Sequence, residues 1–355
     1  MFDSGRESAT IKVNNRMDMK YFFCMMIIIL LAACSDTEDV ESQSVLMGLE
    51  VRDERIVDLV DRHVKPTIIA EGFVWSEGPL WLEDRDALIF ADVPSNSIFE
   101  WRAGDSLRVY MKQSGYPVDD KRRKNSGSNG MVLDADGKLI LCQHGLRQVV
   151  RMTNSILDPS PIFETIADRY EGKRFNSPND ICIASDGTLF FTDPPYGLED
   201  PTGPELLYSG VFMVTPEKEV TLLIDSLTKP NGIALSPDED RLYVAVSDPE
   251  GAVYHVYDLD ENFRITEHEL LFDATHLLDK GLKGLPDGIK VHSSGTIFAT
   301  GPGGVLVFSP KGEWLGSIRT GDRASANLAF NTDESMLFIT ATDWLLKVPL
   351  KTNDE

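Results

Sequence analysis

The most regular feature of the chain is a pattern of polar and apolar positions that recurs through residues 77–340. Each copy begins with a residue that carries a side-chain oxygen, continues through a mostly apolar run to an Asp, Gly or Ser turn, and ends in a second apolar run. Asp and Gly accept the positive φ that tight turns need, so each copy predicts a β-hairpin. The first residues of the copies are Glu77, Asn129, Asn179, Asn231, Asp287 and Asn327.

Further β-rich segments separate these hairpins, among them SIFEWRAG, GVFMVTP, AVYHVYDL and GVLVFSP. A unit of roughly 50 residues with about four strands is typical of a propeller blade. Six copies therefore predict an all-β fold, a six-bladed β-propeller over residues 51–355. A solenoid is the alternative, but strands that alternate with Asp-Gly turns at this period favour the closed ring. Outside the N-terminal region one helix is predicted, within residues 51–63.

The six oxygen-bearing residues are expected to gather at one mouth of the central channel, because the innermost strand of each blade lines that channel. Asn and Asp before Gly are also ordinary turn formers, which would explain any single copy. Glu77 is not a usual turn residue, however, and converging carboxylates repel each other unless a cation neutralises them. Oxygen ligands without cysteine favour Ca²⁺ or Mg²⁺ over Zn²⁺. The pattern therefore predicts a divalent cation at the mouth.

The N-terminal segment predicts export. An apolar run from Tyr21 to Ala33 follows a basic residue and ends in LAAC. The run is too short to span a bilayer comfortably, and it suits the apolar region of a signal peptide. LAAC resembles the bacterial lipobox, in which the cysteine is lipidated. Residues 1–33 are therefore predicted to be a signal region and Cys34 a lipidation site.

Residues 34–50 are predicted to form a flexible acidic tether between the lipid and the propeller. The expected location is that of an exported, membrane-anchored bacterial lipoprotein, periplasmic or at the cell surface. An ordinary cleaved signal peptide is the alternative. Met17 and Met19 are alternative start sites, because residues 1–16 resemble neither a signal nor a folded segment.

Composition narrows the classes of function. A formal net charge of -23 repels phosphate backbones, so nucleic-acid binding is not expected. Cys142 and Cys182 lie in apolar strand-like runs and are predicted to be buried free thiols, and no spacing of Cys and His indicates zinc. The chain contains no GxSxG motif, so a serine-triad esterase is not expected. No feature of the sequence indicates an oligomeric state.

The motifs EGPLW, SNGMVLDADGKLILCQHG, GKRFNSPND followed by FFTDPPYGL, KPNGIALSPDE and LPDGIKV resemble the SMP-30/gluconolactonase/LRE-like family, and CQHG and DPPYG are similar to its bacterial gluconolactonase branch. The resemblance implies a six-bladed propeller with a divalent metal at the channel mouth, most often Ca²⁺, with Mg²⁺ or Zn²⁺ as alternatives. It implies metal ligation by Glu77, Asn179, Asn231 and Asp287. It also implies that Asp287 is the general acid/base and that Asn179 reaches the substrate.

The implied reaction is hydrolysis of a sugar lactone, in which the cation polarises the ester carbonyl and Asp287 moves a proton from water to the ring oxygen. Asn129 and Asn179 are expected to orient the substrate. His144 is the histidine of a repeat-end motif, CQHG, and is a candidate for substrate binding or proton transfer, with a hydrogen-bonded structural role as the alternative. Asp193 and Tyr196, in the TDPPYG run, are expected at the rim.

Two positions depart from the family pattern. Lys290 stands where members that hydrolyse organophosphates often carry a second acidic residue, and Ser177 stands where the animal lactonases carry an arginine. The first departure weakens the interpretation as a phosphotriesterase, and the second leaves sugar recognition open. Two other functions stay open as alternatives. One is a non-catalytic, lipid-anchored propeller that binds a sugar or a protein, because a fold alone does not establish chemistry. The other is a metal-dependent esterase or phosphotriesterase on the same scaffold.

Overall fold

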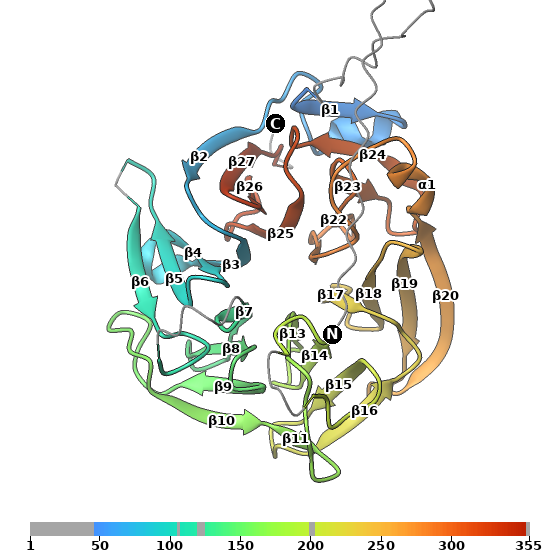
Figure 1. The fold of residues 1–355 in the computed structure, drawn as a ribbon. Coiled ribbons are helices and arrows are strands. Elements are labelled where there is room, and N and C mark those ends of the chain that lie inside the picture. The colour runs from blue at the N-terminus through green and yellow to red at the C-terminus, as the bar shows by residue number, and fades with distance from the viewer. Residues whose placement is uncertain (1–45, 105–106, 119–124, 199–202, 353–355) are drawn as a thin grey trace, which may run out of the picture. The chain divides into compact units, whose positions relative to one another are not determined.

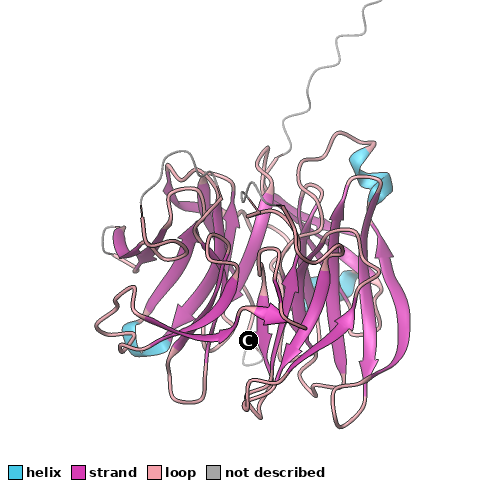
Figure 2. Cartoon of the chain, turned by 60° about the horizontal axis from the view of Figure 1, so that its bottom comes forward, coloured by secondary structure: helices cyan, strands magenta, loops and turns pink. Residues whose placement is uncertain are grey.

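The computed structural model describes residues 46–104, 107–118, 125–198 and 203–352. Within the unit that comprises Ser44–Glu355, antiparallel sheets are arranged as six blades around a central axis (Figure 1). Figure 2 shows that strands dominate the fold and that helices are short. The prediction of an all-β, six-bladed β-propeller is confirmed.

Four blades are meanders of four consecutive strands, with the first strand innermost. The first blade contains β3 (Ser76–Leu82), β4 (Ala87–Asp92), β5 (Ser97–Trp101) and β6 (Arg108–Lys112), and the second contains β7 (Ser128–Leu133), β8 (Leu139–Gln143), β9 (Gln148–Met152) and β10 (Phe163–Ala167). The third contains β13 (Ile181–Ile183), β14 (Leu189–Asp193), β15 (Gly210–Val214) and β16 (Val220–Ile224), and the fourth contains β17 (Pro230–Leu235), β18 (Arg241–Asp248), β19 (Gly251–Leu259) and β20 (Ile265–Asp273). A separate hairpin precedes the third blade, with strands β11 (Arg169–Tyr170) and β12 (Lys173–Arg174).

The last two blades are completed by strands from the N-terminal part of the folded unit. The fifth blade contains β21 (Ile289–Val291), β22 (Ile297–Gly301), β23 (Gly304–Phe308) and β24 (Trp314–Arg319), and the sixth contains β25 (Ser325–Phe330), β26 (Met336–Ala341) and β27 (Trp344–Pro349). β2 (Thr67–Glu71) pairs with β27 as the fourth strand of the sixth blade, and β1 (Gly48–Val51) pairs with β24 as an extra outer strand. The pairing of β2 with β27 joins the two ends of the folded chain and closes the ring.

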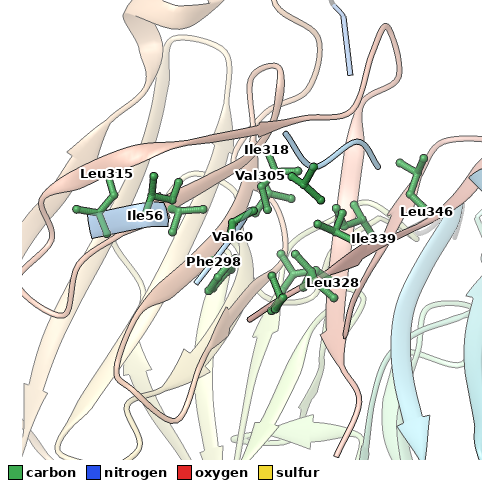
Figure 3. Packing of buried hydrophobic residues seen from close by; sticks show 14 of the residues in the cluster. Ile56, Val60, Phe298, Val305, Leu315, Ile318, Leu328, Ile339 and Leu346 are labelled. Atoms are coloured by element: carbon green, nitrogen blue, oxygen red, sulfur yellow. The ribbon is translucent and has the colours of Figure 1, made fainter. Parts of the chain in front are cut away.

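The hydrophobic core is divided among the six junctions between neighbouring blades. Each of six clusters of buried side chains draws its members from two adjacent blades. Figure 3 shows the cluster between the fifth and sixth blades, where Phe298 and Leu328 come from facing sheets and Ile56 and Val60 are added from the N-terminal side. Burial of apolar surface therefore holds each blade to both of its neighbours.

The helix predicted within residues 51–63 is shorter than expected. The 3₁₀ helix η1 spans Glu54–Asp58, with Asp53 as its N-cap, and Val51 belongs to β1. Ile56 and Val60 are fully buried in the hydrophobic cluster between the fifth and sixth blades. Tertiary packing therefore determines the conformation of this segment more than its helical pattern does. The other helices are η2 (Glu83–Arg85) and α1 (Thr275–Leu278).

The predicted boundary of the tether, residues 34–50, is wrong at its C-terminal end. Gly48–Val51 forms β1, because the edge of β24 offers unpaired backbone groups to this segment. The predicted signal region and Cys34 lie outside the described residues. Among the residues that the structure describes, no helix is long and apolar enough to span a membrane.

The glycine that follows Glu77, Asn129, Asn231 and Asp287 is required by space. A Cβ atom on Gly78 would lie 2.0 Å from the carbonyl oxygen of Asn129 in the next blade, and one on Gly232 would lie 1.9 Å from the carbonyl oxygen of Asp287. Gly130 and Gly288 meet their neighbours in the same way. Only a residue without a side chain lets adjacent innermost strands approach this closely.

Gly232→Ala should therefore lower the thermal midpoint of unfolding markedly, at a cost of about 3 kcal/mol or more, because backbone atoms must move to admit the methyl group. Gly251→Ala is the matched control, since a Cβ at Gly251 meets nothing within 4 Å and its φ is not positive. Differential scanning calorimetry of both variants checks the prediction. Equal midpoints for the two variants would contradict it.

Candidate active site

A cavity of about 1100 Å³ opens at one end of the central channel. It is bounded by the beginnings of innermost strands and by the loops that connect neighbouring blades. Its lining residues are Val74, Trp75, Glu77, Val93, Pro94, Asn125, Asn129, His144, Asn179, Tyr196, Lys229, Asn231, Ser247, Pro249, Leu278, Gly284, Leu285, Asp287, Ala324 and Ser325. Every catalytic, metal-binding and substrate-binding residue predicted within the propeller belongs to this set.

Irregular pairing turns the mouth residues toward the cavity. In β3, β7 and β17 the register with the next strand shifts at Glu77, Asn129 and Asn231, and a bulge of this kind re-aims a side chain. In the third and fifth blades the innermost strand starts two residues after the repeat residue. The backbone N–H groups of Asn179 and Asp287 still donate to backbone carbonyls of the following strand. Both arrangements bring a side-chain oxygen to the cavity.

The sixth repeat residue, Asn327, does not line the cavity. Its side chain is buried, its amide nitrogen lies 3.4 Å from the Asp180 carboxylate, and its amide oxygen accepts the backbone N–H of Leu328. The expectation that all six repeat residues gather at the mouth is therefore wrong for this one. A hydrogen bond to the backbone of its own strand holds the Asn327 amide.

The amide side chains form a connected chain of hydrogen bonds. Asn129 Nδ2 donates to Asn179 Oδ1 at 2.9 Å, and Asn179 Nδ2 donates to Asn231 Oδ1 at 2.6 Å. Asn231 Nδ2 then donates to Ser247 Oγ at 2.8 Å, and the Ser247 hydroxyl donates to the backbone carbonyl of Pro286. Each amide is thereby fixed in direction, and the chain ends next to Asp287.

Two carboxylates face the same cavity across the ring. Glu77 accepts the backbone N–H of Gly78 at 3.1 Å and the indole N–H of Trp75 at 3.4 Å. Burial, together with repulsion from Asp180, raises the pKa of Glu77. Burial also raises the pKa of Asp287, and repulsion from Glu77 and Asp180 adds to the increase. A bound cation would relieve this repulsion.

The residues present fit a hard divalent cation. Asp287 Oδ1 and Asn129 Oδ1 are buried oxygens without a hydrogen-bond partner, so the site keeps acceptor capacity that the protein does not use. The donors are carboxylate and amide oxygens, the ligands that Ca²⁺ prefers. No group of three or more His, Cys, Asp or Glu side chains suited to a metal occurs among the described residues, and amide oxygens line the cavity beside the two carboxylates.

Comparison with known proteins places this arrangement in a family. The sequence model of the SMP-30/Gluconolactonase/LRE-like region matches residues 75–343. The chain belongs to this family. The resemblance noted from the sequence motifs is thereby confirmed.

Individual relatives agree with the family assignment. The chain is 36% identical over 305 residues to a gluconolactonase of Zymomonas mobilis, covering 84% of this chain and 85% of the relative. It is 29% identical over 216 residues to lactonase drp35 of Staphylococcus aureus, covering 59% and 61% of the two chains. The solved structure of a gluconolactonase from Xanthomonas campestris superimposes with a TM-score of 0.74 at 28% identity, over 87% of this chain and 96% of that one.

His144 is buried beside the amide chain. Its Nε2 lies 3.0 Å from Asn179 Oδ1, and Gly197 packs so closely on it that a Cβ there would lie 2.4 Å from the His144 Cβ. Burial lowers the pKa of His144 to about 4, despite hydrogen bonds to Asn179 and to the backbone of Asn125 that oppose the shift. The imidazole is therefore neutral near pH 7, and it donates to Asn179 through Nε2.

Of the two expected rim residues, Tyr196 lines the cavity and Asp193 does not. The Asp193 carboxylate is fully buried and accepts the backbone N–H groups of Asn176 and Ser177, each at 2.7 Å. It thus fixes the segment that leads into Asn179. The expectation for Asp193 is wrong because its side chain points to the backbone of this segment and away from the mouth.

The two family departures also lie away from the cavity. Ser177 is fully buried, donates to the carbonyl of Pro194 at 2.5 Å and accepts the N–H of Gly197 at 2.9 Å. Lys290 lines a separate cavity of about 320 Å³, together with Cys182 and Ile183. The Ser177 hydroxyl joins two loops and does not offer its oxygen to a ligand.

Both cysteines predicted to be free thiols are free, and Cys142 is buried whereas Cys182 is partly buried.

Sequence reasoning missed Asp180, whose buried carboxylate influences both acidic residues of the site. Asp180 occupies the position at which four of the other five repeats have glycine, and its Oδ1 accepts the backbone N–H of Ile181 at 2.9 Å. This exception to the repeat was a signal in the sequence. Trp75 and Lys229 were also missed, because they precede the first residues of their repeats, and Ser247 was missed because it lies near the end of an apolar strand run.

Asp193→Asn should lower the stability by about 1–3 kcal/mol, because an amide has one acceptor oxygen and leaves one of the two buried N–H groups unpaired. Asp186→Asn, in an exposed turn of the same blade, is the control, since the Asp186 carboxylate accepts one N–H, that of Thr188. Thermal unfolding of both variants measures the difference. A change at Asp193 no larger than that at Asp186 would argue against the positioning role.

Proposed function

We propose that this chain is a hydrolase that opens sugar lactones with the help of a divalent cation at the mouth of the propeller. The observation that carries the proposal is the convergence of the Glu77 and Asp287 carboxylates with three linked amides in one cavity. Membership of the SMP-30/Gluconolactonase/LRE-like family supports it, as does 36% identity to a gluconolactonase. These relatives support hydrolysis of a lactone, and the metal and the residue roles are our own inference.

Glu77, Asn179, Asn231 and Asp287 would hold the cation, with Ca²⁺ suited best to the oxygen donors and Mg²⁺ or Zn²⁺ as alternatives. When bound, the cation would supply a Lewis acid for the ester carbonyl and charge stabilisation for the oxyanion. Asn231 Oδ1 accepts one amide N–H and keeps a second lone pair for a cation. Asn179 Oδ1 accepts from both Asn129 and His144, so ligation by Asn179 requires one of these partners to move.

Lactone hydrolysis forms a bond between a water oxygen and the carbonyl carbon and breaks the bond between that carbon and the ring oxygen. Asp287 accepts the proton of the attacking water and returns it to the ring oxygen, which leaves as the hydroxyl of the product acid. Burial raises the pKa of Asp287, and a carboxylate with a raised pKa is a stronger base that accepts the proton of the attacking water more readily. The Asp287 side chain faces the cavity, where the substrate must lie.

Asn129, Asn179 and His144 position the substrate. Asn129 Oδ1 has no partner in the protein and can accept a substrate hydroxyl. Neutral His144 holds the Asn179 amide in place and excludes water from one side of it. Because the imidazole is buried and its pKa is lowered, we assign His144 to positioning and not to proton transfer.

Asp287→Asn and Glu77→Gln should each reduce turnover of glucono-1,5-lactone by on the order of 10³-fold or more and abolish metal retention, because each removes a ligand charge and the first also removes the proton acceptor. A pH-stat assay and elemental analysis after desalting provide the two readouts. Asp238→Asn, in an exposed turn, is the control.

Both site variants should unfold at or above the temperature of the metal-free wild type, because each removes one of the mutually repelling carboxylates. This comparison separates loss of chemistry from loss of the fold. Undiminished lactone hydrolysis by both variants in the presence of a chelator would contradict the proposal. Aryl esters and phosphotriesters in the same assay distinguish the esterase alternatives, and turnover of none of these substrates would favour a non-catalytic binding propeller.

We also propose that Cys34 is lipidated and tethers the propeller to a membrane, on the basis of the LAAC motif that ends the apolar N-terminal run. Cys34→Ser should move the protein from the membrane fraction to the soluble fraction of a bacterial host and should leave its specific activity unchanged. Cys142→Ser, within the propeller, is the control and should stay membrane-bound. Unchanged fractionation of the Cys34 variant would contradict the anchor.

A further inference from the structure

The walls of the mouth cavity are apolar, whereas its polar groups are gathered on the floor. The floor carries the carboxylates and the amide chain described above. The wall side chains come from the loops that lead into the first, fifth and sixth blades and from loops within the first and fourth blades, and they are Val74, Trp75, Val93, Pro94, Pro249, Leu278, Leu285 and Ala324. A cavity with this division binds one polar group deeply and an apolar group above it.

One wall segment is held rigidly although it is exposed. The side chain of Val74 is 62% exposed, yet the Asp92 carboxylate accepts the backbone N–H groups of Val74 and Trp75, the latter at 2.9 Å. The Trp75 indole is fixed in turn by Glu77. An exposed apolar side chain on a fixed backbone is typical of a preformed binding surface, because little conformational freedom is lost on binding.

The cavity is larger than an unsubstituted sugar lactone requires. At about 1100 Å³ it lies at the upper end of the range of cavities that enclose drug-sized ligands, whereas a hexose lactone has about twelve non-hydrogen atoms. Hydroxyl groups placed against Val74, Leu278 or Leu285 would lose their hydrogen bonds to water without replacement. An apolar group at the same place would gain from leaving water.

The walls offer no strong charged partner to an anionic substituent. Their side chains are apolar. Lys229 is the cationic side chain among the described lining residues, and its ammonium group lies 3.6 Å from the Asp248 carboxylate, which offsets its charge. A neutral apolar substituent is therefore favoured over a carboxylate or a phosphate.

We propose that the preferred substrate is a lactone that carries a neutral, apolar substituent, with its ring on the polar floor and its substituent against the apolar walls. This inference rests on the proposed lactonase function and specifies its substrate class. It assigns Val74 and Leu278 as specificity-determining residues that take no part in the chemistry.

The test is a series of δ-lactones with unbranched 5-alkyl chains from methyl to heptyl, assayed beside glucono-1,5-lactone on the metal-loaded enzyme. We expect kcat/KM to rise by roughly fourfold for each methylene that the walls cover. A flat series, with glucono-1,5-lactone still hydrolysed, overturns the inference and leaves the proposed function intact. Hydrolysis of no lactone overturns both.

Two wall variants test where the preference arises. Val74→Thr keeps the shape of the side chain and replaces a methyl group with a hydroxyl. Leu278→Asn keeps the shape approximately and introduces a polar amide. Each variant should lower kcat/KM for the heptyl lactone by at least about fivefold. Neither should change the value for the methyl lactone, because that substrate does not reach the walls. Val109→Thr, on an exposed position of β6, is the matched control. An undiminished heptyl preference in both wall variants overturns the assignment.

Discussion

The close approach of neighbouring innermost strands is the constraint on which the rest of the structure depends. At Gly78 and Gly232 a single methyl group would overlap the backbone of the next blade. Strands this close to one axis must direct the side chains of the preceding residues into a shared volume. Five oxygen-bearing side chains consequently meet in one cavity, and a site of this composition is a geometric result of how the ring closes.

Asp180 modifies this arrangement at one position. It stands where four other repeats have glycine, and its carboxylate lies among the N–H groups of Ile181 and Ile233 and the amide of Asn327. Burial raises the pKa values of Glu77 and Asp287, and repulsion from the Asp180 charge raises both further. The floor therefore holds more negative charge than the surrounding hydrogen bonds neutralise, and a cation at the mouth would offset that electrostatic cost.

The floor and the walls of the cavity are built by different parts of the blades. Mouth residues at the start of innermost strands supply the carboxylates and amides, and they are fixed by the backbone of the ring. Val93, Pro249 and Leu278 lie outside these strands and supply the apolar walls. The floor and the walls can thus vary independently, because a loop residue can change without moving the strands that carry the carboxylates and amides.

The sequence by itself determined the number of blades, the hairpins and the positions of Glu77 and Asp287, because turn chemistry and hydrophobic alternation are local properties. Only the tertiary structure decided that Asn327 and Asp193 do not line the cavity, that β1 and β2 add outer strands to the fifth and sixth blades, and that the cavity walls are apolar. These outcomes depend on contacts between segments far apart in the chain. The sequence of one segment does not specify such contacts. An aspartate at the end of a strand can be buried or can lie at the rim, and the local sequence is the same in both cases.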